Sequence, residues 1–211
     1  MEASTSVSTA PRHRVAEDAI LDAACAVFAS EGFDRANMAT IAARAGTTKP
    51  TLYARFGSKD ELFAAAVTRE YELRKERLFA AYDTGGGEPF HRSLHRWTAA
   101  YFDFVRERPD GFRLISEGER SPAGAPIIER AKGEIVDRIA DLVVSVSGHE
   151  RRPGAHLVAS MISGMLTSCA REAVIRGRAD LDDAAALCEQ FLYSALRGLD
   201  PQLMDAVDPS G

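Results

Sequence analysis

The sequence predicts an all-α fold, in which three short N-terminal helices are joined by a long fourth helix to a larger helical domain. Apolar side chains recur every three or four residues along most of the chain, and this spacing is typical of one helix face. Glycines close several of these periodic segments, as they commonly do at helix C-termini. No segment carries a convincing alternation of apolar and polar residues, so no β-strand is predicted.

The composition indicates an ordered globular protein. The chain has 211 residues, 45% of them apolar and 27% charged, which is the balance of soluble globular proteins. That length allows one sizeable core, or a small module joined to a larger one. No apolar run approaches the roughly 18 residues of a membrane span, and the N-terminus lacks the apolar stretch of a secretory signal. We therefore expect a cytoplasmic protein.

Neither a disulfide framework nor a bound metal is predicted. Cys25, Cys169 and Cys188 form no C-x-x-C pair, and each lies in an apolar, alanine-rich segment, which favours buried core residues over a redox-sensing role. His91 and His95 have the spacing of two metal ligands on one helix face, but no third ligand is identifiable. We expect no metal and no cofactor.

The first helix is predicted from about Val15 to Glu31, because apolar residues recur there at helical spacing and Gly32 follows. Residues 1–11 are rich in Ser, Thr and Ala without periodicity and predict a flexible tail. A second helix is predicted from about Met38 to Ala45, with Asn37 as its N-cap.

The third helix is predicted to begin at Thr48 or Lys49, because a proline, here Pro50, is tolerated only in the first turn of a helix. A glycine ends this helix, and Ser58 can cap the fourth, which is predicted from about Lys59 to Tyr82. At 1.5 Å per residue the fourth helix would span roughly 35 Å, enough to connect two modules. Later helices are predicted over about 90–109, 127–146, 155–176 and 182–199, with a helical turn in GFRLIS, loops in EGERSPAGAP and SGHERRPG, and a loose C-terminal tail.

Basic residues are concentrated in one segment of an acidic chain. The net charge is −5, yet the basic residues between Arg35 and Lys59 are interrupted by no Asp or Glu. Such a segment is typical of a localised nucleic-acid face, although charge alone also fits a solvated basic surface. Three short helices with a glycine turn before the third match a helix-turn-helix, whose recognition helix enters the major groove of DNA by its N-terminal end.

The start of the third helix therefore holds the candidate DNA contacts. Lys49 can donate to guanine or phosphate, and the ring of Pro50 can pack on a thymine methyl group. With Thr51, these residues are expected to read the base sequence. Tyr53 and Arg55 lie farther along the helix and would reach the DNA backbone, which positions the protein without specifying sequence.

The stretch IAARAGTTKPTLYARFGSKDEL resembles the N-terminal signature of the TetR family, and the resemblance covers about residues 15–66. It includes an Ile-Ala pair, an Ala-Gly turn, a Thr-Leu-Tyr core, a Phe, and a Lys that opens the fourth helix. Ala39 departs from the pattern, since some members carry a DNA-contacting Arg there, and Arg55 replaces the commoner His, which shifts phosphate contacts towards Arg55. The residues predicted to bind DNA are Asn37, Thr47, Thr48, Lys49, Pro50, Thr51, Tyr53, Arg55 and Lys59.

The resemblance also implies how the chain is divided and assembled. Residues 12–66 would form the helix-turn-helix domain, and residues 67–211 an all-helical domain that binds an unknown small-molecule effector and builds a homodimer on its last two helices. The wide apolar faces of these two helices favour the dimer over burial inside one subunit. The predicted dimer residues are Leu157, Met161, Met165, Leu187 and Phe191.

An aromatic stripe in the segment 90–104 is the candidate lining of an effector pocket, with plain core as the alternative. The predicted pocket residues are Trp97, Tyr101, Phe104 and Phe112. The sequence as a whole predicts a dimeric repressor that a small molecule releases from a palindromic operator in double-stranded DNA. The alternatives are an effector-dependent activator and an architectural DNA-binding protein without an effector. No G-x-S-x-G, phosphate loop or H-E-x-x-H motif occurs, and we expect no catalytic activity.

Overall fold

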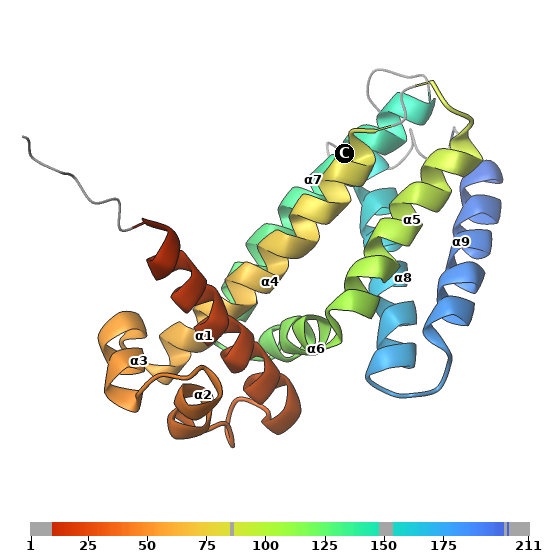
Figure 1. Cartoon of the computed structure of the whole chain (residues 1–211). Helices are drawn as coiled ribbons and strands as arrows, with labels where there is room; N and C mark the ends of the chain where they lie inside the picture. Colours follow the sequence, from red (N-terminus) through yellow and green to blue (C-terminus); the bar gives the residue numbers. More distant parts are fainter. Residues whose placement is uncertain (1–9, 85–86, 148–153, 201, 203–211) are drawn as a thin grey trace, which may run out of the picture.

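A computed structural model of the chain describes residues 10–84, 87–147, 154–200 and 202. All the regular secondary structure within these residues is helical, which confirms the all-α prediction. In chain order (Figure 1) the helices are α1 (Ala10–Glu31), α2 (Met38–Arg44), α3 (Lys49–Phe56), α4 (Lys59–Tyr82), α5 (Phe90–Glu107), α6 (Pro109–Gly118), α7 (Ala125–Ser147), α8 (Ala155–Val174) and α9 (Leu181–Arg197).

Two helices differ from their predicted extents. α1 begins at Ala10 instead of Val15 and so includes the end of the predicted tail, the rest of which lies outside the described residues. α6 is a helix from Pro109 to Gly118, where only a short turn was predicted. Pro109 suits the first turn of a helix, and α6 is stabilised by burying Phe112 and other apolar side chains. The predicted SGHERRPG loop and C-terminal tail lie largely outside the described residues.

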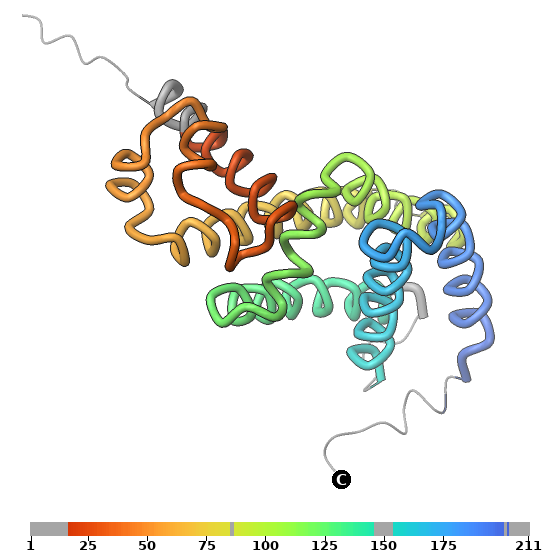
Figure 2. The backbone as a smooth tube through the Cα atoms, turned by 90° about the horizontal axis from the view of Figure 1, so that it is seen from below, coloured from red at the N-terminus to blue at the C-terminus, as the bar shows by residue number. Residues whose placement is uncertain are grey.

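The helices form a small N-terminal cluster and a larger bundle that share α4. Figure 1 shows α1, α2 and α3 at one end of the molecule and α8 and α9 at the other, and the second view in Figure 2 shows the same separation. α4 begins beside α3 and packs against α1, α5, α6 and α7, while α8 packs against α7 and α9. One continuous helix therefore runs from the N-terminal cluster into the bundle.

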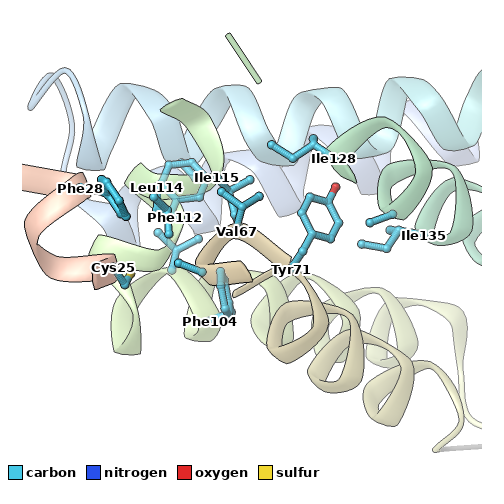
Figure 3. Close-up of a cluster of buried hydrophobic side chains, with 14 of the residues drawn as sticks. Cys25, Phe28, Val67, Tyr71, Phe104, Phe112, Leu114, Ile115, Ile128 and Ile135 are labelled. Carbon is cyan, nitrogen blue, oxygen red and sulfur yellow. The ribbon is translucent and has the colours of Figure 1, made fainter. Parts of the chain in front are cut away.

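A hydrophobic core fastens the N-terminal cluster to the bundle. Figure 3 shows Cys25 and Phe28 of α1 close to Phe112 of α6, with Val67 of α4 and Phe104 of α5 beside them. None of these five side chains exposes more than 3% of its surface. Burial of apolar side chains of this size is worth roughly 1.5–3 kcal/mol each, so α1 is held firmly against α4 and α6.

Two of the cysteines are buried, as predicted. Cys25 and Cys188 lie in the core, whereas Cys169 is half-buried, and all three thiols are free. Burial raises the pKa of the Cys188 thiol to about 12 and raises that of Cys25 further. Both thiols are therefore uncharged at neutral pH and act as small apolar groups. Among the helices that the structure describes, none is long and apolar enough to cross a membrane.

Candidate DNA-binding surface and ligand cavity

The N-terminal end of α3 is an exposed, capped helix start. Thr48 is its N-cap, and the Thr48 Oγ1 atom accepts a hydrogen bond from the Thr51 backbone N–H at 3.3 Å. Leu52 is completely buried and anchors α3, which packs against α2 and α4. Lys49, Pro50 and Thr51 all point away from this anchor and are exposed. The helix start predicted from the proline is therefore confirmed, and its polar residues face solvent.

Tyr53 and Lys49 share one exposed edge of α3. Tyr53 exposes 42% of its surface, and the Lys49 Nζ atom lies 5.8 Å from the centre of the Tyr53 ring. The two residues are four positions apart, which places them on adjacent turns of the same face. This edge therefore presents one exposed cation and one exposed aromatic ring, and both residues were predicted to contact DNA.

The Thr48 cap yields a prediction about stability. Replacing Thr48 by alanine should lower the free energy of unfolding by about 1 kcal/mol, because the N-cap hydrogen bond to the Thr51 N–H is lost. Thr48→Ser is the matched control, since serine retains the hydroxyl and should leave stability nearly unchanged. Urea unfolding followed by circular dichroism measures both variants. Equal stability of the alanine and serine variants would show that this cap contributes nothing.

Two basic residues predicted to bind DNA, Arg55 and Lys59, also make contacts within the chain. Arg55 pairs with Glu17 of α1 at 3.6 Å. The Lys59 Nζ atom donates to the Asp34 carbonyl at 3.1 Å and lies 4.7 Å from the Phe33 ring centre. These contacts tie α3 and α4 to α1 and to the loop after it. Arg55 and Lys59 therefore hold the N-terminal cluster together, whatever else they contact.

The remaining predicted residues lie at the start of α2 and in the turn before α3. The Asn37 Oδ1 atom accepts the Ala39 N–H at 2.8 Å, which makes Asn37 the N-cap of α2, as predicted. Thr47 is half-buried in the turn between α2 and α3. Thr40 and Arg44 are also exposed on α2 and were not among the residues predicted to bind DNA. They lie on the face opposite the buried residues of α2, and the helical spacing of those buried residues indicates that face from the sequence.

A cavity of about 210 Å³ lies in the bundle, far from α3. By the same measure a single water molecule needs roughly 10–15 Å³, so the cavity has room for an organic molecule. The lining is almost entirely apolar, and Arg197 is its only charged residue among those described. Helices α4, α5, α7, α8 and α9 all contribute, with side chains that include Tyr82, Leu94, Trp97, Ile139, Leu166 and Leu192.

The structure separates the four predicted pocket residues. Trp97 lines the cavity, while Tyr101 lines a smaller neighbouring void. Phe104 and Phe112 line neither space and belong to the core against α1. The aromatic stripe of α5 is roughly 20 Å long at 1.5 Å per residue, and the cavity borders only its N-terminal half. The C-terminal half packs against α4 and α6 instead.

Trp97 carries a buried hydrogen-bond donor. Its Nε1 atom has no partner within the described residues. The indole packs edge-on against the Tyr82 ring, with the centres 6.0 Å apart. A buried donor without an acceptor costs roughly 1–3 kcal/mol, so a ligand that offers an acceptor here would gain from it.

An exposed apolar face covers α8 and α9. Leu157, Met161, Leu187 and Phe191 each expose between 46% and 67% of their surface. Met165, the fifth predicted dimer residue, is half-buried and packs against the core of its own chain. Large exposed apolar patches on soluble proteins commonly mark protein–protein contacts.

Comparisons with known proteins agree with this architecture. Residues 20–66 match the model of the family described as bacterial regulatory proteins, tetR family. The chain is 31% identical over 180 residues to the HTH-type transcriptional activator FasR of Mycolicibacterium smegmatis, covering 84% of this chain and 81% of FasR.

Solved structures show the same fold. A TetR-like transcriptional regulator from Rhodococcus sp. RHA1 is 30% identical, with a TM-score of 0.73 over 88% of this chain and 97% of that one. The fatty acid degradation regulator FadR from Bacillus halodurans is 19% identical, with a TM-score of 0.71 over 88% of this chain and 96% of that one. At that lower identity, the likeness concerns the fold alone.

Proposed function

Since the chain belongs to the TetR family and is a DNA-binding transcription regulator, we propose that it binds a palindromic operator as a homodimer and releases it when a small molecule occupies the cavity. Family members are transcription regulators and not enzymes. Residues 12–66 would hold the DNA, and residues 67–211 would dimerise and bind the effector. Because its partner is DNA, the regulator would work in the cytoplasm.

The observation that carries the proposal is the exposed start of α3. Lys49, Pro50 and Thr51 stand clear of the protein on a helix anchored by Leu52. A two-fold dimer would present two such helix starts to successive major grooves, about 34–36 Å apart. This spacing predicts an operator with inverted half-sites about one helical turn, or a multiple of it, apart.

The apolar face of α8 and α9 supports the dimer. Leu157 and Met161 lie on one side of α8, and Leu187 and Phe191 on one side of α9, at the end of the molecule opposite α3. A second copy would remove these side chains from water, and burying apolar surface is worth roughly 25 cal/mol per Å² before the costs of association. Dimerisation at this end leaves both α3 helices free to reach DNA.

Activation is the second candidate outcome, and the relative FasR favours it, since FasR is described as a transcriptional activator. The same DNA contacts serve either outcome. A bound dimer represses when it covers the promoter and activates when it binds beside the promoter and recruits polymerase. A reporter fused to the operator and its promoter distinguishes the two, because deleting the regulator raises expression in one case and lowers it in the other.

The DNA assignment is tested with an operator selected by the purified protein from genomic fragments. Lys49→Ala should weaken operator binding by about tenfold or more, because a lysine contact to a base edge or phosphate is lost. The salt dependence should also become shallower if the contact is to phosphate. Fluorescence anisotropy at several salt concentrations measures both effects, and Lys132→Ala, an exposed lysine on α7, is the control. Unchanged affinity and salt dependence in the Lys49 variant would contradict the assignment.

A further inference from the structure

Arg74 of α4 is a buried cation that forms no ion pair with any residue the structure describes. It exposes only 5% of its surface, and its Nε atom has no hydrogen-bond partner in the described part of the chain. Arg74 also takes part in none of the ion pairs that those residues form, in contrast to Arg69 and Arg108, which both bind Glu70. A buried charge is costly unless it is paired, so Arg74 calls for an explanation.

Among the described residues, the groups near Arg74 do not neutralise its charge. Its guanidinium lies 4.0 Å from the centre of the Tyr71 ring and also hydrogen-bonds the Tyr71 side chain, and both contacts leave the positive charge in place. Burial raises the pKa values of Tyr71, Tyr82 and Tyr101, and the charge of Arg74 lowers them by less, so these phenols remain neutral. Two carboxylates are close enough to influence Tyr71: Glu119 pairs with Arg171 at 2.6 Å, and Glu129 is exposed to solvent.

Arg74 borders a small void that adjoins the ligand cavity. The void measures about 10 Å³, roughly the space of one water molecule. Tyr82, Ile139 and Leu166 line both the void and the apolar cavity, so these three side chains form the partition between them. The hydroxyl-bearing residues Ser163 and Thr167 of α8 complete the polar side of the void.

We propose that the effector is an amphipathic carboxylic acid whose apolar body fills the cavity and whose carboxylate pairs with Arg74. The proposal rests on the effector-controlled function proposed above and names the chemical class of that effector. A carboxylate is the smallest common organic anion, and its two oxygens match the planar guanidinium fork of an arginine. The head group reaches Arg74 when a side chain of the partition, such as Leu166 or Tyr82, rotates aside.

This arrangement connects the ligand directly to α4. Arg74 and Tyr82 both belong to that helix, which begins at Lys59, directly after the recognition helix α3. The apolar body of the ligand would contact α5, α7, α8 and α9 at the same time. A ligand that bridges α4 and the dimerising helices would have a different affinity for each of two orientations of α4. That difference in affinity would shift the equilibrium between the two orientations.

Trp97 provides the readout, because it is the only tryptophan of the chain and it lines the cavity. Octanoate, decanoate and dodecanoate, each paired with the primary alcohol of the same length, are titrated below their micelle-forming concentrations while Trp97 fluorescence is followed. In the unmodified chain the best acid should bind at least tenfold more tightly than its alcohol, since only the acid can form a charge-assisted pair. Arg74→Met should abolish this preference while leaving the affinity for the alcohol intact. Arg74→Lys, which retains the charge, should restore part of the preference.

The outcomes separate this proposal from the function on which it rests. If acid and alcohol bind the unmodified chain equally, or if Arg74→Met retains the preference, the carboxylate pairing is wrong and the cavity remains an effector site. If no acid and no alcohol changes Trp97 fluorescence, the carboxylate proposal is overturned. Operator binding, measured by anisotropy without ligand, tests the DNA-binding function independently. Retained alcohol binding by Arg74→Met shows that the variant is folded.

Discussion

A chain carrying Phe191→Asp should be a monomer in solution and should bind its operator about 10² to 10⁴-fold more weakly. Phe191 and Leu187 are among the most exposed large apolar side chains of the described chain, on the face proposed to bury itself against a second copy. An aspartate at that position would place an unpaired charge in an apolar interface, which is strongly unfavourable. A monomer loses the second half-site contact, and coupling two binding modules commonly increases overall affinity by that factor.

Sedimentation velocity measures the oligomeric state, and anisotropy with the selected operator measures affinity. Leu73→Asp is the matched control, because Leu73 is also an exposed apolar residue but lies on α4, away from α8 and α9. The control should remain dimeric and bind the operator normally. A Phe191→Asp protein that still sediments as a dimer would place the interface on another face of the molecule.

Local sequence signals predicted the N-terminal domain well. Pro50 located the start of α3, and the side chains of Asn37, Thr48 and Ser58 form the capping hydrogen bonds that their residue types favour. Gly57 ends α3 with a φ of 78°, which few residues other than glycine adopt. These features depend on residues within one or two turns of each other, so a linear reading of the chain suffices.

The cavity could be predicted less well from the sequence, because its position depends on how distant helices meet. Periodicity placed Trp97 and Phe104 on one face of α5 but did not show that a cavity borders only one end of that face. Arg74 could not be recognised from the sequence either. On a helix with many charged residues it resembles a solvated arginine, and its burial without an ion pair among the described residues is evident only after folding. A buried arginine in a segment whose pattern predicts solvent exposure is the kind of discrepancy expected at functional or strained sites.

Replacing Glu70 by alanine should lower the free energy of unfolding by about 3 kcal/mol. Glu70 is completely buried on α4, and its two carboxylate oxygens each accept a hydrogen bond from Arg108 at 2.6 Å. Arg69 donates to the same carboxylate at 2.8 Å, and both arginines also reach Asp22 of α1. Removing one member of a buried ion pair commonly costs 3–5 kcal/mol. We expect the lower end because Arg108 is only partly buried and can turn towards water.

The expected loss of unfolding free energy reflects the position of the ion pairs around Glu70. The ion-pair cluster of Asp22, Arg69, Glu70 and Arg108 joins α1, α4 and the start of α6. At Gly111 α6 approaches α4 so closely that a Cβ atom would clash with the Glu70 carboxylate. Glu70 is also one helical turn from Arg74 on the same helix. The cluster therefore fixes the N-terminal domain to the part of α4 that the proposed ligand would contact.

Asp22→Asn and Glu70→Gln distinguish the buried charge from its surroundings. Asp22 exposes most of its side chain, and exposed ion pairs contribute roughly 0–1 kcal/mol, so its variant should be nearly as stable as the unmodified chain. Glu70→Gln retains the shape and part of the hydrogen bonding but removes the negative charge, and its stability should lie between those of Asp22→Asn and Glu70→Ala. Urea unfolding of all three gives the order. A Glu70→Ala protein as stable as Asp22→Asn would mean that Arg69 and Arg108 need no buried counter-charge, and the same reasoning would then fail for Arg74.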